Sequence, residues 1–118
     1  MTKAYQQLDL VDEAFFASRR QVGEGFVEKL IVVFGEEAPK LVAMLKQTHL
    51  SGNLPELAEM GHKLKGMCLN VGAQRLSGLG KEIEWAAKSS DEAQLKPLID
   101  DLDQVLQSTL IAMGQMIQ

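Results

Sequence analysis

The stretch Gly61-His62-Lys63-Leu64-Lys65-Gly66 decides the fold and the function expected of this chain, together with Asn70-Val71-Gly72-Ala73 and Leu76 downstream. It lies within a helical pattern yet contains two glycines. Each glycine in a helix interior costs roughly 1 kcal/mol relative to alanine. Glycines at positions −1 and +4 from a histidine therefore suggest that another group approaches this histidine closely.

A helical wheel separates this stretch into an apolar face and a polar face. At about 100° per residue, one stripe contains Leu57, Met60, Leu64, Met67, Cys68 and Val71. His62 lies on the opposite side and shares its face with Ala58, Lys65, Gly66 and Leu69. We therefore expect the imidazole to face water, beside a bare backbone at Gly66 and the cation of Lys65, whereas Cys68 should be a structural residue of the core.

The rest of the chain also shows helical periodicity, and strand-like alternation does not appear. The predicted helices run from about 10 to 22, from about 25 to the loop at 51–53, from about 54 to 69, from about 73 to 88, and from beyond Ser89 to about 116. Asp9 is a candidate N-cap of the first helix, and Gly52 suits the left-handed residue that ends the second. Ser89 and Glu92 match a capping box that would open the last helix.

Four long amphipathic helices with short connections predict an all-α fold, an antiparallel up-down four-helix bundle. The short extra N-terminal helix would cover one end of this bundle. Pro39 should bend the second helix, and Pro97 either kinks the last helix or marks its start. We expect residues 1–118 to form one domain, since 118 residues suffice for a single hydrophobic core.

Composition excludes several classes of function. A net charge of −4 argues against nucleic-acid binding, which needs clustered basic residues. The chain lacks both an apolar run of about 18 residues and a signal-peptide pattern, and its single cysteine fits a reducing compartment. We therefore expect a cytoplasmic protein, monomeric because the bundle buries its own apolar stripes. Two histidines without a thiolate cluster make a metal site improbable.

The motif His-x-Leu-Lys-Gly, with Gly-Ala at +10 and +11 and Leu at +14, resembles the signature of histidine-containing phosphotransfer (HPt) domains of two-component phosphorelays. The matching residues are His62, Leu64, Lys65, Gly66, Gly72, Ala73 and Leu76, and Ile83-Glu84 stands where the family often has Leu-Glu. Residues 9–34 also resemble the family's first two helices. Gly61 stands where alanine is usual, and Met67 and Cys68 where small residues are favoured; these departures lie along the core stripe or beside the histidine.

The resemblance implies a phosphocarrier rather than an enzyme. His62 would accept a phosphoryl group from a receiver-domain aspartate and pass it to another, since a neutral imidazole nitrogen is a competent nucleophile. Lys65 would compensate the phosphoryl charge and Gly66 would leave room for the partner. We expect no cofactor in this chain, because the receiver domain would bring the Mg²⁺ ion.

Partners implied by the resemblance are response-regulator receiver domains or a hybrid sensor kinase. Ala58, Lys63 and Leu69 flank the histidine and are expected to help dock them. The stretch Phe26–Phe34 is apolar nearly all round, so part of it could extend this patch. Lys81 is a further candidate for its positive rim.

Two other functions compete with phosphotransfer. A pure binding module would dock a receiver without chemistry, but such a module should have lost its histidine, and His62 is intact. The phosphoacceptor part of a histidine kinase favours an acidic residue after its histidine and a proline five residues on, where this chain has Lys63 and Met67. Asn70 is more typical of a helix C-terminus than of a phosphate contact. His49, in the last turn of the second helix, is not expected to be phosphorylated.

Overall fold

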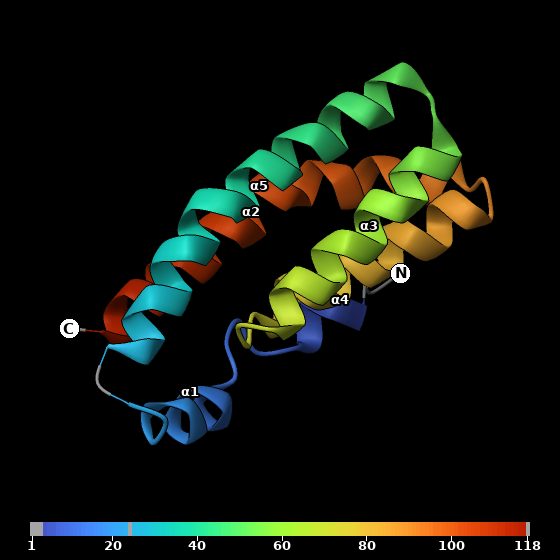
Figure 1. The fold of residues 1–118 in the computed structure, drawn as a ribbon. Coiled ribbons are helices and arrows are strands. Elements are labelled where there is room, and N and C mark those ends of the chain that lie inside the picture. The colour runs from blue at the N-terminus through green and yellow to red at the C-terminus, as the bar shows by residue number, and fades with distance from the viewer. Residues whose placement is uncertain (1–3, 24, 118) are drawn as a thin grey trace.

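The chain folds into helices alone over the residues that the computed structural model describes, which are 4–23 and 25–117 (Figure 1). A short 3-10 helix and five α-helices follow one another as η1 Ala4–Gln7, α1 Glu13–Arg20, α2 Phe26–Ser51, α3 Leu54–Leu69, α4 Gln74–Lys88 and α5 Glu92–Met116. The predicted all-α class is confirmed. The bounds of α3 also agree with the prediction, because Pro55 in its first turn and Asn53 as its N-cap fix where it begins.

The four long helices contact one another in a closed ring. α2 packs on α3 and α5, and α4 packs on the same two helices from the other side, while α1 packs on α2 and η1 packs on α4. The predicted up-down bundle is compatible with this ring. Each long helix contributes fully buried side chains to a shared core, among them Leu45, Leu57, Leu64, Leu79, Ile83 and Leu102.

Two glycines allow α3 and α4 to approach so closely that their backbones touch. A Cβ added to Gly61 would lie 2.9 Å from the backbone nitrogen of Glu84 and 2.9 Å from the carbonyl oxygen of Gly80. A Cβ on Gly80 would in turn lie 2.9 Å from the carbonyl oxygen of Gly61. Gly61 and Gly66, on either side of His62 in the sequence, predict that another group approaches the histidine closely. At Gly61 this group is α4 of the same chain, whose Glu84 also lies 3.3 Å from Nδ1 of His62.

Helix α1 begins at Glu13, three residues later than predicted, and Asp12 rather than Asp9 is its N-cap. The Asp12 side chain accepts a hydrogen bond from the backbone N–H of Phe15 at 3.1 Å. The backbone N–H of Asp12 itself donates to the carbonyl oxygen of Gly72 at 2.8 Å. Asp12, held by this contact with the α3–α4 turn, has an extended backbone with φ −92° and ψ 99°, so the helix starts only after it.

The predicted capping box at Ser89 is also wrong. Ser89 ends α4, Ser90 adopts a left-handed conformation with φ 54°, and the side chain of Asp91 caps α5 by accepting from the N–H of Gln94. Pro97 lies inside α5 and does not mark its start, and Pro39 lies inside α2. Gly52, with φ 74°, ends α2 as predicted.

Residues 4–12, here called the N-terminal strap, cross the outside of α4 and contain η1, which the sequence does not predict. Tyr5 is buried, its hydroxyl donates to the Asp101 carboxylate on α5, and its backbone N–H donates to Glu82 at 2.8 Å. Further along the strap, the side chain of Arg75 donates to the carbonyl oxygen of Leu8 at 2.8 Å. The strap is thus tied to both α4 and α5.

Candidate functional site

His62 projects from the middle of α3 into solvent, as predicted. Its side chain is 65% exposed. Gly66 lies one turn further along the helix, and a Cβ added there would meet no atom within 4 Å. The two glycines flanking the histidine therefore differ: Gly61 faces α4, and Gly66 faces open space.

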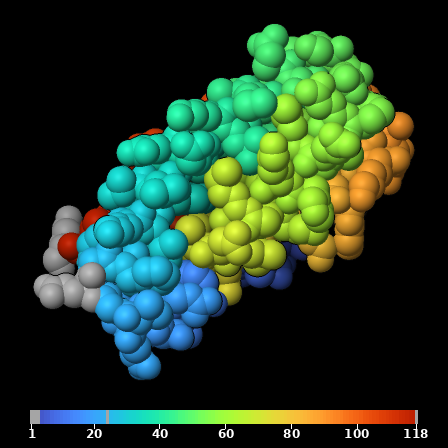
Figure 2. Space-filling view, viewed as in Figure 1, coloured from blue at the N-terminus to red at the C-terminus, as the bar shows by residue number. Residues whose placement is uncertain are grey.

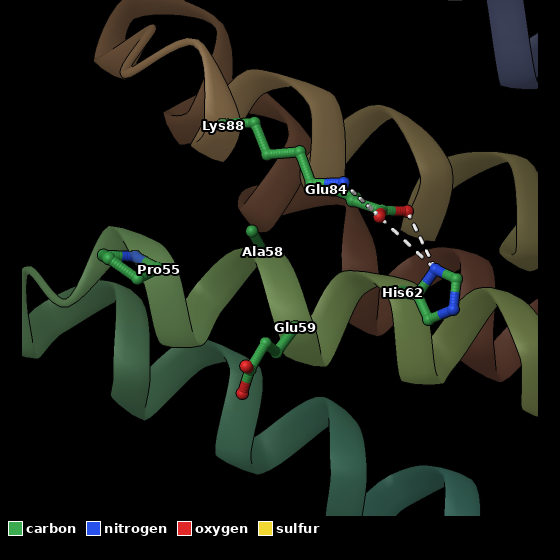
Figure 3. A pocket seen from close by; sticks show the side chains of 6 residues that line it. All are labelled: Pro55, Ala58, Glu59, His62, Glu84 and Lys88. Carbon is green, nitrogen blue, oxygen red and sulfur yellow. Dashed lines mark hydrogen bonds and ion pairs between the residues drawn. The ribbon is translucent and has the colours of Figure 1, made fainter.

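Glu84, on the adjacent face of α4, contacts the imidazole from the side of α4 (Figure 3). Its two carboxylate oxygens lie 3.3 Å and 3.4 Å from Nδ1 of His62, and its side chain is only 7% exposed. An ionised carboxylate can only accept hydrogen bonds, so this contact assigns the proton to Nδ1. The other ring nitrogen, Nε2, is then unprotonated and points away from Glu84 (Figure 3).

Two lysines share the same carboxylate. Nζ of Lys88 lies 2.9 Å from Oε2 of Glu84, and Nζ of Lys65 lies 3.6 Å from Oε1. Burial raises the pKa of Glu84, but hydrogen bonds from Lys88 and His62 and the charges of Lys88 and Lys65 outweigh it, so the net pKa lies below its ordinary value. Glu84 is therefore ionised at neutral pH.

The charges beside His62 are of both signs. The Glu84 carboxylate and the ammonium groups of Lys65 and Lys88 sum to +1, and Glu59, which lines the hollow next to the imidazole, adds one negative charge. Lys65, the cation expected to meet the phosphoryl group, comes from α3, and Lys88 comes from α4 and lines a hollow together with His62, Ala58 and Pro55 (Figure 3). Both ammonium groups already have a carboxylate partner, so an arriving anion would compete with Glu84 for them.

The residues expected to dock a partner lie in different environments. Leu69 is 59% exposed and Lys63 is exposed, but Ala58 is only 6% exposed, because it packs against α4. Ala58 therefore lines the hollow beside His62 and offers almost no contact area of its own, which corrects its expected role. In the apolar stretch of α2, Val32 and Val33 are exposed, so that only part of the stretch is buried, as predicted.

The other singled-out residues have structural contacts. Cys68 is buried, and this burial raises the pKa of its thiol to about 12. Nε2 of His49 lies 3.6 Å from the Glu92 carboxylate of α5. Asn70 ends α3, with its backbone N–H donating to the carbonyl oxygen of Gly66.

Glu84 and Lys88 were not predicted as site residues. Glu84 was noticed only as part of Ile83-Glu84, and Lys88 only as the end of a helix. One available signal is their spacing of four, which places them on one face of α4. Nothing in the sequence alone indicates that Glu84 is buried.

Among the described residues, no three His, Cys, Asp or Glu side chains gather into a candidate metal site. Nor does any helix in this part of the chain combine the length and the hydropathy needed to cross a bilayer.

Comparison with protein families shows to which family this chain belongs. The family model for the Hpt domain matches residues 29–112, which include α3, α4 and most of α2 and α5. The chain belongs to the Hpt domain family. Hpt domains carry phosphoryl groups on histidine in phosphorelays, where they interact with receiver domains and kinases. No curated protein and no solved structure gave a significant match. The strap and α1 of this Hpt domain lie outside the matched residues.

Proposed function

We propose that this Hpt domain is a phosphocarrier in which His62 accepts a phosphoryl group from a receiver-domain aspartate and passes it to another receiver. One observation carries the proposal: an exposed imidazole whose Nδ1 is engaged by the buried Glu84, with Nε2 directed to solvent beside the open backbone of Gly66. This arrangement holds the nucleophilic nitrogen in place while leaving it accessible.

The transfer needs no other nucleophile from the chain. The Nε2 lone pair attacks phosphorus, an N–P bond forms, and the P–O bond to the aspartyl carboxylate breaks, with its electron pair leaving on the carboxylate. The imidazole ring becomes cationic because Nδ1 keeps its proton. Glu84 stabilises this cation through the hydrogen bond already present at Nδ1. The reverse step regenerates the neutral ring.

Lys65 and Lys88 would share the charge of the incoming group with the Mg²⁺ ion of the receiver. Each can keep one N–H on Glu84 and turn another toward a phosphoryl oxygen, since an ammonium group has three donors. Gly66 gives the receiver loop access to Nε2, because this position has no side chain and an added Cβ would meet no atom within 4 Å.

Phosphotransfer profiling tests the proposal. The chain is incubated with isotopically phosphorylated receiver domains of the source organism, and label on the chain is followed over time. We expect wild type and the control His49→Gln to take up label equally, and His62→Gln to take up none. Label on His62→Gln at the wild-type level would refute the site. Binding of a receiver without any transfer to wild type would instead indicate a pure binding module.

A further inference from the structure

A second hollow lies on the α3–α4 face, further toward the C-terminal end of α3 than His62. It is lined by Leu8, Lys65, Leu69, Gln74, Ser77, Gly78 and Lys81. Lys65 also contacts Glu84, so this hollow, here called the strap hollow, is continuous with the histidine site. One of its walls is the N-terminal strap, which emerges beside the end of α3 in the space-filling view (Figure 2).

Gly78 of α4 allows the strap to form this wall. A Cβ on Gly78 would lie 2.7 Å from Cδ1 of Leu8 and 3.1 Å from Cβ of Tyr5. The hydrogen bond from Arg75 to the carbonyl oxygen of Leu8 and the anchors of Tyr5 fix the strap on both sides of the contact. Leu8 is nevertheless 41% exposed, and Leu69 opposite it is 59% exposed. Two leucines thus line this hollow with much of their apolar surface in water.

The charged residues around the strap hollow are both basic. Lys65 and Lys81 line it, and among residues 4–23 and 25–117 no acidic side chain does. The apolar groove between α2 and α3, lined by Phe26, Leu30, Val33 and Met67, instead has one lysine and one glutamate, Lys29 and Glu37. A receiver domain approaches with an aspartyl phosphate and the acidic groups that hold its magnesium ion. The strap hollow is therefore the better electrostatic match.

We propose that the strap hollow is the docking site of the receiver domain, an inference that rests on the proposed function. Leu8 and Leu69 would receive an apolar side chain of the receiver. Lys65 and Lys81 would face its acidic rim. The strap, outside the residues matched by the family model, then contributes directly to recognition. A receiver seated there approaches Nε2 of His62 from the side of Gly66, which is open.

The experiment measures the rate of label transfer to the chain against receiver concentration, using the receiver that transfers fastest in the profile. We expect Leu8→Ser and Leu69→Ser each to raise the half-saturating receiver concentration about tenfold, with the limiting rate unchanged. The control Leu50→Ser removes a leucine that is 80% exposed on the α2–α5 face and should leave both quantities unchanged. Thermal unfolding of each variant confirms that it is folded.

Direct binding separates this inference from the proposed function. Trp85 is the only tryptophan of the chain, lies on α4 and contacts Lys81, so its emission reports occupancy of the hollow with a tryptophan-free receiver. If wild type binds a receiver but takes up no label, the proposed function fails while the docking site is still tested by the leucine variants. If Leu8→Ser and Leu69→Ser bind and transfer like wild type, or only Val33→Ser weakens binding, the docking site is refuted and His62 chemistry is untouched.

Discussion

Gly61→Ala and Gly66→Ala make the same chemical change on the same helix, and we expect opposite effects on stability. At Gly66 the added methyl meets no atom within 4 Å, so the helix propensity of alanine should stabilise the protein by about 0.5–1 kcal/mol. At Gly61 the methyl would lie 2.9 Å from two backbone atoms of α4. Backbone cannot swing aside as a flexible side chain can, so α3 and α4 must separate.

The net effect at Gly61 is the difference between two terms. Overpacking of this kind costs about 1–3 kcal/mol, and the gain in helix propensity offsets about 1 kcal/mol of it. We expect a net destabilisation of about 1 kcal/mol at Gly61, and thus a gap of about 2 kcal/mol between the two variants. For a chain of this size, this gap corresponds to a difference in Tm of about 8 °C.

Urea denaturation followed by circular dichroism measures both free energies of unfolding, and thermal scans check their order. A second readout comes from phosphotransfer, because Gly61 packs on the backbone of Glu84, the residue that holds His62. Gly61→Ala should lower the limiting rate, whereas Gly66→Ala should raise the half-saturating receiver concentration. A Gly61→Ala protein as stable as Gly66→Ala would refute the close contact of the two helices.

The site and the strap junction give further predictions. Because the folded-state pKa of Glu84 is lowered, its contribution to stability is complete above an unfolded-state pKa of about 4.3 and is lost as the pH falls through the lower folded value. Urea midpoints of wild type and Glu84→Gln should therefore converge on acidification from pH 5, and a constant difference would contradict the ionised pair. Glu84→Gln should also slow transfer to His62 about tenfold at neutral pH, because a charge-assisted hydrogen bond is weakened; an unchanged rate would exclude a positioning role. Asp12→Ala should lower the free energy of unfolding by about 1 kcal/mol, whereas Asp9→Ala should leave it nearly unchanged. The reverse order would indicate that Asp9 is the N-cap.

The main helices were predictable because their signals are local. The apolar stripe through Leu57, Leu64 and Cys68 fixes which face of α3 is buried, and this leaves His62 outside. Pro55 and Gly52 mark helix ends through their own backbone preferences, without reference to the rest of the fold. The outward direction of the histidine therefore follows from residues close to it in sequence.

Features set by contacts between distant residues were not predictable in this way. Asp9 and Asp12 are equally good caps by residue type, and only the hydrogen bond from Asp12 to Gly72 decides between them. η1 has four residues, and its position depends on Tyr5 reaching α4 and α5. Hydrophobic periodicity does not predict such segments, because they form no apolar stripe of their own.

Glu84 is the clearest case of a site residue that periodicity conceals. Charged residues are rarely buried, so an analysis of the hydrophobic pattern predicts that a carboxylate is exposed even at a core-facing position. It is buried here because Gly61 and Gly80 let α3 approach and because His62, Lys65 and Lys88 supply three partners. The contacts of Glu84 with these three side chains depend on the distance between α3 and α4. The sequence alone does not give this distance.

The same three partners make the function separable from the fold. Removing the partner of a buried charge usually costs several kcal/mol, because the charge is left uncompensated. At Glu84, loss of the imidazole leaves both lysines in place, and Lys88 is the nearest of the three partners at 2.9 Å. His62→Gln should therefore remain folded with an ionised Glu84, so that its failure to take up label reports missing chemistry. The fold thus holds His62 by a carboxylate whose own charge is compensated by two lysines when the imidazole is removed.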